Sequence, residues 1–403
     1  MKLTFKKTID PCIEIEPFSE YGEWNSLSFD NASVFSDSSK FYPLDFSLFC
    51  NENVKIHEKK KNFVNLVSHI YPSNICNQNC VFCFTKKERR LGSKQMLSEI
   101  AIDNIVNSAK QGGLKLARIV GTGEPLTNPL TPVLIKKLSQ NGVNTTLITN
   151  GELLDDDHYF GLNLIDLIQE NLKFLRVSLG AADSNIYNML HNPSKDDAFK
   201  KILKSIERIS KNKTINDLII GTSFIVTTEN INQISKFAKL CVNIGVDVIW
   251  YRIDAKNILS KHEIEIINEQ LNDIKEINIK INSEELNRNI ANTTYMMSPR
   301  CHAIKFKTVI TSDGKVYPCI TYQFNKKYEL GDLNKKSLYE ILSSDTYKLF
   351  LKKRENSLLE YCEKNCHEKI FNNSLELHKL NIASNVFVKN TLTFLNEQNL
   401  HTY

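Results

Sequence analysis

Three cysteines stand close together in the segment YPSNICNQNCVFCF, which covers residues 71–84. Cys76, Cys80 and Cys83 are spaced as C-x3-C-x2-C, and thiols this close in sequence usually bind metal. Iron–sulfur clusters and structural zinc sites normally take four protein ligands, whereas this segment supplies three. A cluster held by three thiolates keeps one iron open, and a small molecule with an amine and a carboxylate could chelate that iron. A structural zinc site is the alternative interpretation.

A second group of cysteines lies near the C-terminus and consists of Cys301, Cys319, Cys362 and Cys366. A hairpin and a loop that bring them together would complete the ligand shell of a second iron–sulfur cluster, and a four-thiolate zinc site would use the same residues. Cys241, in contrast, falls at helical core spacing in FAKLCVNIG and is predicted to be a buried apolar thiol. In a reducing compartment, such grouping favours metal binding over disulfides.

The composition is that of a soluble globular protein, with 41% hydrophobic and 24% charged residues in a chain of 403. The 51 basic and 46 acidic residues leave a net charge of +5, which is too small to indicate nucleic-acid binding. No apolar run has the length of a membrane span. Asp10 and Glu14 interrupt the position where a signal peptide would have its apolar core. We therefore expect a cytoplasmic protein.

Six apolar strand patterns alternate with amphipathic helix patterns between residues 63 and 285. This alternation predicts a parallel sheet with right-handed crossovers, in an α/β fold. Six units are fewer than the eight of a closed barrel, so we expect a partial (β/α)6 TIM barrel with its chemistry at the carboxyl ends of the strands. The predicted strands are 64–71, 116–121, 143–151, 174–180, 217–227 and 246–253, and the helices between them are 96–111, 129–142, 163–171, 197–211 and 230–245.

The flanking regions have different patterns. Residues 1–62 form a strand- and loop-rich N-terminal extension, with strand patterns at 2–9 and 12–18 and a charged linker at 57–62. Residues 286–371 form a small cysteine-rich domain. It contains a hairpin that turns at Asp313-Gly314 and a helix at 337–355. Residues 372–403 are predicted to be a helical tail.

The cysteine motif after the first strand, together with the alternation over residues 63–285, resembles the radical S-adenosylmethionine (SAM) family. The resemblance implies that Cys76, Cys80 and Cys83 hold a [4Fe–4S] cluster and that SAM supplies the remaining ligand through its amine and carboxylate. It also implies that Phe82, before the third cysteine, packs beside the SAM adenine.

The ends of the later strands resemble the SAM-binding segments of this family. Gly121, Gly123 and Glu124 in IVGTGEP stand where relatives hold the SAM amino group, and Thr122 replaces a glycine that is frequent there. Glycines let the backbone approach a ligand closely, and a carboxylate can accept from a cationic amine. The resemblance also implies contacts to the SAM ribose, carboxylate or adenine at Asn150, Ser178 and Gly221.

Three further positions at or just after the ends of the fourth and sixth strands could contribute to the site. Many relatives carry an Asp where this chain has Gly180, so no substrate-binding carboxylate is assigned there. Asp183 is predicted to cap the following helix. Arg252 could bind an anionic group or form a structural ion pair.

The C-terminal cysteines resemble the start and the end of the SPASM domain, and the cysteines between them are absent. The resemblance to the shortened twitch version of this domain implies one auxiliary [4Fe–4S] cluster. A cluster without an open iron is suited to carrying an electron or holding the domain folded, and not to binding substrate.

Together these features predict a radical SAM oxidoreductase. In this family SAM is cleaved reductively to a 5′-deoxyadenosyl radical, which abstracts a hydrogen atom from a C–H bond. We expect the substrate to be a small polar metabolite or a peptide and the net reaction to be an oxidation through the auxiliary cluster. Epimerisation or cross-linking of a ribosomal peptide is the alternative, and a non-catalytic zinc-binding interaction protein is the alternative of another class. The basic residues Lys86, Lys87, Arg89 and Arg90 could dock a flavodoxin or ferredoxin as electron donor.

Metal analysis separates the enzyme from the zinc protein. We expect anaerobically purified protein to be brown and to contain about eight iron and about eight sulfide per chain, because two [4Fe–4S] clusters require that number. Colourless protein that holds zinc instead would contradict the assignment.

Overall fold

The computed structural model describes most of the chain between residues 67 and 354 and two short strands before it. The described residues are 3–5, 13–15, 67–86, 93–111, 114–154, 159, 162–211, 213, 218–254, 259–282, 301 and 303–354. The predicted linker at 57–62 and helical tail at 372–403 lie outside them. The predicted N-terminal strand patterns are confirmed, because β1 (Leu3–Phe5) pairs antiparallel with β2 (Ile13–Ile15).

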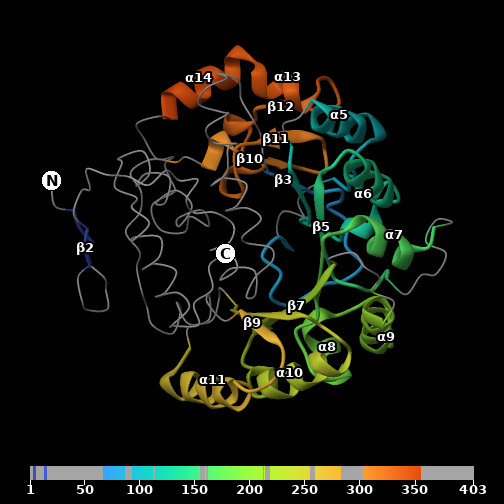
Figure 1. The fold of residues 1–403 in the computed structure, drawn as a ribbon, viewed down its shortest axis with the longest axis vertical. Helices are drawn as coiled ribbons and strands as arrows, with labels where there is room; N and C mark the ends of the chain where they lie inside the picture. The colour runs from blue at the N-terminus through green and yellow to red at the C-terminus, as the bar shows by residue number, and fades with distance from the viewer. Residues whose placement is uncertain are drawn as a thin grey trace.

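A ten-stranded sheet, which does not close into a barrel, organises the molecule (Figure 1). Its strand order is β12-β11-β10-β3-β4-β5-β6-β7-β8-β9, and all pairs from β10 through β3 to β9 are parallel. The predicted partial barrel is therefore confirmed. Its six predicted strands are β3 (Val67–Ile70), β4 (Leu116–Ile119), β5 (Asn144–Thr149), β6 (Phe174–Ser178), β7 (Ile219–Val226) and β8 (Val248–Ile253). A further parallel strand, β9 (Lys280–Asn282), follows β8 and was not predicted.

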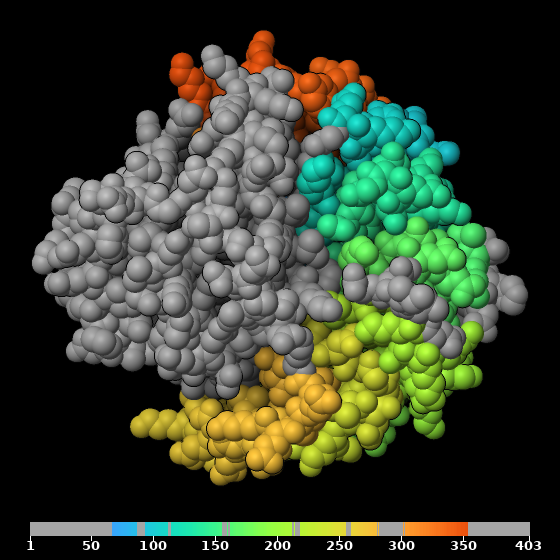
Figure 2. Space-filling model, in the orientation of Figure 1, coloured from blue at the N-terminus to red at the C-terminus, as the bar shows by residue number. Residues whose placement is uncertain are grey.

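Helices cover the outer face of this sheet. They are α5 (Glu99–Lys110), α6 (Thr131–Gln140), α7 (Leu164–Asn171), α8 (Ser184–His191), α9 (Ala198–Lys211), α10 (Ile234–Asn243) and α11 (Lys261–Asp273). Figure 2 shows their side chains as a continuous band in chain order. The predicted cap at Asp183 is confirmed, because its side chain accepts from the Ile186 N–H at 3.1 Å. Helix α11 was not predicted; it begins at a capping box between Ser260 and Glu263.

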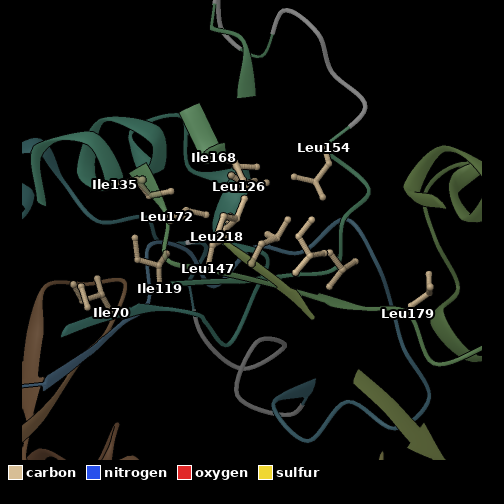
Figure 3. Packing of buried hydrophobic residues seen from close by; sticks show 14 of the residues in the cluster. Ile70, Ile119, Leu126, Ile135, Leu147, Leu154, Ile168, Leu172, Leu179 and Leu218 are labelled. Atoms are coloured by element: carbon tan, nitrogen blue, oxygen red, sulfur yellow. The ribbon is translucent and has the colours of Figure 1, made fainter. Parts of the chain in front are cut away.

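The core lies between the sheet and these helices. Because successive strand residues point to opposite faces, alternate positions of each strand enter this layer. Ile70, Ile119 and Leu147, from three neighbouring strands, are fully buried there. Figure 3 shows them close to helical residues such as Ile135 and Ile168. The burial of this continuous apolar layer is the main favourable contribution to the fold.

The inner face of the sheet is more polar and only partly buried. His69, Arg118, Arg176 and Arg252 are half-buried, and each lies between strand neighbours that are buried in the outer layer. None of the helices that the structure describes covers this face, so a ligand can be bound on it.

A small aromatic cluster fills part of the inner face. The rings of Phe174 and Trp250 meet edge to face at 5.2 Å, and the Arg176 guanidinium lies 5.6 Å from the Trp250 ring centroid. Gly221 makes room for this cluster, because a Cβ there would lie 2.3 Å from Trp250 Cζ3.

The C-terminal hairpin extends the same sheet. Strand β10 (Lys307–Ile310) pairs parallel with β3, and β11 (Lys315–Tyr317) and the short β12 (Gly331–Asp332) follow antiparallel. The predicted Asp313-Gly314 turn is confirmed, and Gly314 has the positive φ of 81° that the turn requires. The hydroxyls of Ser68 and Thr308 are 2.9 Å apart in the buried seam between β3 and β10.

The helix predicted for residues 337–355 is two helices, α13 (Leu338–Ser343) and α14 (Asp345–Arg354). The single-helix prediction is wrong, because Ser344 is extended, with ψ 153°. Its hydroxyl accepts from the Tyr347 N–H at 3.2 Å, so a serine cap restarts the chain as a second helix. Helix α13 packs against α5, where the Tyr339 N–H donates to the Ser108 hydroxyl at 2.8 Å. In the described part of the chain, none of the helices is long and apolar enough to cross a membrane.

Candidate active site at the cysteine loop

The three clustered cysteines lie in a loop that leaves the carboxyl end of β3 and is fastened at its base. The Tyr71 N–H donates to the Ile310 carbonyl of β10 at 2.8 Å, and the Leu97 N–H donates to the Pro72 carbonyl at 2.8 Å. Asn74 pairs with Gln95 through two hydrogen bonds, one from each backbone N–H. The loop therefore leaves the sheet in a defined direction.

The segment after β4 lies directly against this loop. The Gly123 N–H donates to the Ser73 carbonyl at 3.2 Å, and the Glu124 N–H donates to the Ile75 carbonyl at 2.7 Å. A Cβ at position 123 would lie 2.2 Å from the Ile75 carbonyl oxygen, so only glycine fits this contact. Gly123 thus permits a close approach of the backbone to the cysteine loop, and the predicted approach to SAM stays a prediction.

Glu124 is a buried carboxylate that connects β4 to β5. Oε1 accepts from the Leu126 N–H at 3.0 Å and the Thr149 hydroxyl at 2.7 Å, and Oε2 accepts from the Asn150 N–H at 2.7 Å. Burial raises the pKa of Glu124 to about 7, and these three hydrogen bonds oppose that rise. The side chain fixes the end of β5 beside the loop.

Asn150, at the end of β5, bridges from Glu124 to the cysteines. Its Nδ2 donates to Asn77 Oδ1 at 2.8 Å and lies 3.8 Å from the Cys76 sulfur. Its Oδ1 accepts from the Glu152 N–H at 3.0 Å. The structure therefore brings Glu124, Asn150 and Cys76 together, as the sequence predicted for one site.

The three thiols are half-buried, and none of them forms a disulfide within the described chain. The Cys83 sulfur lies 3.4 Å from the Thr85 hydroxyl, which donates to the Thr122 carbonyl at 2.8 Å. The Cys80 sulfur lies 3.7 Å from both Gln78 Oε1 and His191 Nδ1. Each thiol is thus oriented by a different neighbour.

This set of donors can be tested against the two metal hypotheses. Among the described residues, no three His, Cys, Asp or Glu side chains gather around a point as a single ion requires. In a four-iron cluster each thiolate binds a different iron, so three thiolates on one loop can hold such a cluster and leave one iron for an outside ligand.

Helix α8 forms a platform beneath the loop that sequence reasoning missed. Its last carbonyls accept from loop amides, with Val81 N–H to Leu190 O at 2.9 Å and Asn79 N–H to His191 O at 3.2 Å. The helix ends at Asn192, whose φ of 42° is left-handed. The sequence predicted no helix range for these residues and indicated only that Asp183 caps the following helix.

His191 is the least expected residue of the site. It is 1% exposed, and burial lowers its pKa to about 3. The predicted adenine neighbour, Phe82, meets the His191 ring edge to face at 5.1 Å. No sequence motif marks a histidine that lies more than a hundred positions from Cys80, the cysteine it contacts.

The remaining predicted SAM contacts lie along the strands. Ser178 ends β6, and its hydroxyl is 3.5 Å from that of Ser223. Gly121 lies near the loop, where a Cβ would be 3.1 Å from the Ser73 carbonyl. Gly221 lies early in β7 beside Trp250, and its tight packing is with that ring.

The other predicted positions have mixed outcomes. Cys241 is fully buried in α10, as predicted, and burial raises its pKa to about 12. Arg252 pairs across the sheet with Ile225, near the carboxyl end of β8. Cys301 and Cys319 are half-buried at the two ends of the β10–β11 region, whereas Cys362 and Cys366 lie outside the described residues.

Comparison with known proteins finds a matching family model for each of two segments of the chain. Residues 70–241 match the radical SAM superfamily, and residues 301–367 match the SPASM iron–sulfur cluster-binding domain. The first match begins in β3 and includes the cysteine loop, Glu124, Asn150 and His191.

Curated relatives are similar at low identity. The tungsten-containing aldehyde ferredoxin oxidoreductase cofactor-modifying protein of Pyrococcus furiosus is 25% identical over 323 residues, which is 71% of this chain and 83% of that protein. A probable GTP 3′,8-cyclase of Saccharolobus islandicus is 28% identical over 178 residues, 44% of this chain and 53% of the relative.

Solved structures with the same fold include two that have S-adenosylmethionine bound. Streptococcus suis SuiB bound to S-adenosylmethionine aligns with a TM-score of 0.56 and 18% identity, over 87% of this chain and 85% of SuiB. The structure of anSMEcpe with bound AdoMet aligns with a TM-score of 0.51 and 18% identity, over 75% of this chain and 87% of the other.

The fold and the site therefore define an iron–sulfur enzyme that uses SAM as its cosubstrate. The chain is a member of the radical SAM superfamily and carries a C-terminal SPASM domain. This membership implies a SAM-binding [4Fe–4S] cluster and auxiliary iron–sulfur binding. It favours an enzyme over a zinc-binding interaction protein.

Replacement of Glu124 tests its structural role. The pKa of Glu124 in the folded protein, about 7, lies above the ordinary value of 4.5, so the parent should lose stability as pH rises between these values. Glu124→Gln should lack that pH dependence. It should also lose about 1–3 kcal/mol in the free energy of unfolding, because the Asn150 N–H would face an amide NH2.

Thermal unfolding of the cluster-free protein from pH 5 to pH 8 measures both effects. Glu269→Gln, at an exposed position of α11, is the matched control and should behave like the parent. An unchanged pH dependence in Glu124→Gln would contradict the account.

Proposed function

We propose that this radical SAM enzyme abstracts a hydrogen atom from a C–H bond of a small polar metabolite or a peptide, with net oxidation of the substrate. The observation that carries the proposal is the contact of Gly123 and Glu124 with the three-cysteine loop at the carboxyl end of the sheet. When bound and reduced, the cluster supplies the electron that cleaves SAM to methionine and a 5′-deoxyadenosyl radical.

The residues of this chain position the reactants and exclude water. Cys76, Cys80 and Cys83 hold the SAM-binding cluster. Gly121, Gly123 and Glu124 hold the SAM amino group beside it. The remaining SAM contacts are Phe82, Asn150, Ser178 and Gly221. The buried hydrogen bonds of Glu124 and Asn150 support these roles, because they hold the ends of β4 and β5 at fixed positions relative to Cys76.

Cys301, Cys319, Cys362 and Cys366 would hold the auxiliary cluster, which would supply an acceptor for the electron left on the substrate. The C-terminal hairpin between Cys301 and Cys319 is attached to the main sheet, and this attachment supports the role of an electron acceptor. Strand β10 pairs with β3, and the Ile310 carbonyl accepts from the Tyr71 N–H at the start of the cysteine loop. Lys86, in the same loop, begins the basic run proposed to dock a flavodoxin or ferredoxin.

A peptide substrate with epimerisation or cross-linking is the second candidate. Two structures with this fold favour the peptide substrate: SuiB bound to its precursor peptide SuiA, with a TM-score of 0.54, and anSMEcpe with AdoMet and the Cp18Cys peptide, with a TM-score of 0.51.

Cysteine substitution tests the cluster assignment. Each of Cys76→Ala, Cys80→Ala and Cys83→Ala should reduce anaerobic SAM cleavage to the level of an enzyme-free control, because a missing thiolate leaves the cluster incompletely held. The measurement is 5′-deoxyadenosine formed with dithionite. Cys241→Ala, far from the loop in α10, is the matched control and should keep the cleavage. Parental cleavage in any of the first three variants would refute the ligand assignment.

Deuterium transfer tests the substrate and the net reaction together. A candidate peptide or metabolite deuterated at the reacting carbon should pass deuterium to 5′-deoxyadenosine, which mass spectrometry detects. A product that is two hydrogens lighter than the substrate supports oxidation. A product of unchanged mass supports epimerisation, and absence of transfer rejects that carbon as the site.

A further inference from the structure

A chain of buried polar side chains connects Glu152 to Cys80. Gln78 is 4% exposed, and its Nε2 donates to Glu152 Oε2 at 3.2 Å and to the Tyr187 phenol oxygen at 2.8 Å. Because both donors of the amide point this way, its Oε1 points the other way, toward His191 and Cys80.

The orientation of Gln78 determines which nitrogen of His191 carries the proton. Gln78 Oε1 lies 3.3 Å from His191 Nδ1 and can only accept. A neutral imidazole that donates to Gln78 Oε1 carries its proton on Nδ1, and the inference rests on this tautomer. The same Nδ1 lies 3.7 Å from the Cys80 sulfur. When that sulfur is an iron-bound thiolate, Nδ1–H is the donor between two acceptors.

The imidazole is also held in one orientation. The Tyr187 ring stacks on it at 4.4 Å with an angle of 12° between the planes, and the Phe82 ring meets it edge to face. Gly180 lies beside Nε2 of the imidazole, and a Cβ at position 180 would be only 2.8 Å from that nitrogen. Gly180, the departure that the sequence showed, thus leaves the space that His191 needs.

We infer that His191 is a positioning residue that donates its Nδ1–H to the Cys80 thiolate and raises the reduction potential of the SAM-binding cluster. Hydrogen bonds to cluster sulfurs tune such potentials, because they stabilise the more negative, reduced state. Gln78 and Glu152 act one step further out by fixing the protonated nitrogen. The inference rests on the proposed assignment of Cys80 as a cluster ligand.

Redox titration of the reconstituted enzyme, followed by the electron paramagnetic resonance signal of the reduced cluster, tests the inference. His191→Phe keeps an aromatic ring but removes the donor, so the ratio of reduced to oxidised cluster at a fixed potential should fall severalfold. His191→Asn offers an amide donor near the position of Nδ1 and should restore most of the parental ratio. His262→Phe, at an exposed histidine of α11, is the matched control and should match the parent.

Each outcome decides the question. A parental potential in His191→Phe at equal iron content overturns the inference, as does an equal shift in the Phe and Asn variants. If His191→Phe cannot assemble the cluster, assembly in His191→Asn still supports the donor, and failure of both overturns it in favour of a packing role. A SAM-binding cluster that assembles normally in Cys80→Ala would instead show that the ligand assignment of Cys80 is wrong.

Discussion

The close approach of two backbone segments, 73–75 and 121–124, determines the geometry of the active site. Amides of Gly123 and Glu124 donate to carbonyls of the cysteine loop, and the gap admits no Cβ at position 123. A loop whose apolar residues Val81 and Phe84 are exposed could not hold one conformation through its own contacts. Its conformation is instead set by the ends of β4 and β5 and by the last turn of α8, all of which belong to the rigid core.

The two faces of the sheet divide stability from function. The outer face is a continuous apolar layer under the helices, and its burial stabilises the fold. The inner face carries half-buried polar residues, and Arg176 lies over the Trp250 ring on this face. This division lets the inner face vary with the substrate while the outer face preserves the geometry of the loop.

The C-terminal domain is joined to the site through the sheet itself. Strand β10 adds to the edge at β3, the strand from which the cysteine loop leaves, and α13 packs on α5. A domain attached by main-chain hydrogen bonds and helix packing holds a fixed position relative to that loop. A fixed position supports the proposal that the auxiliary cluster accepts the electron left on the substrate.

The sequence by itself determined the local features of this protein. Hydrophobic periodicity predicted the six strands, the helices between them and the open barrel, and the spacing of Cys76, Cys80 and Cys83 predicted the metal site. These signals are local, because alternation, capping and ligand spacing operate within a few residues. The serine that divides residues 337–355 into two helices was missed, because a cap in an otherwise helical pattern is a weak local signal.

Only the tertiary structure decided which distant residues meet. The parallel pairing of β10 with β3 joins segments more than two hundred residues apart, and the contact of His191 with Cys80 joins residues separated by 111 positions. The burial that raises the pKa of Glu124 to about 7 arises from neighbours that folding brings together. The need for glycine at positions 123 and 180 has the same origin. Such contacts depend on how strands and helices pack in three dimensions, and no periodicity within one segment encodes them.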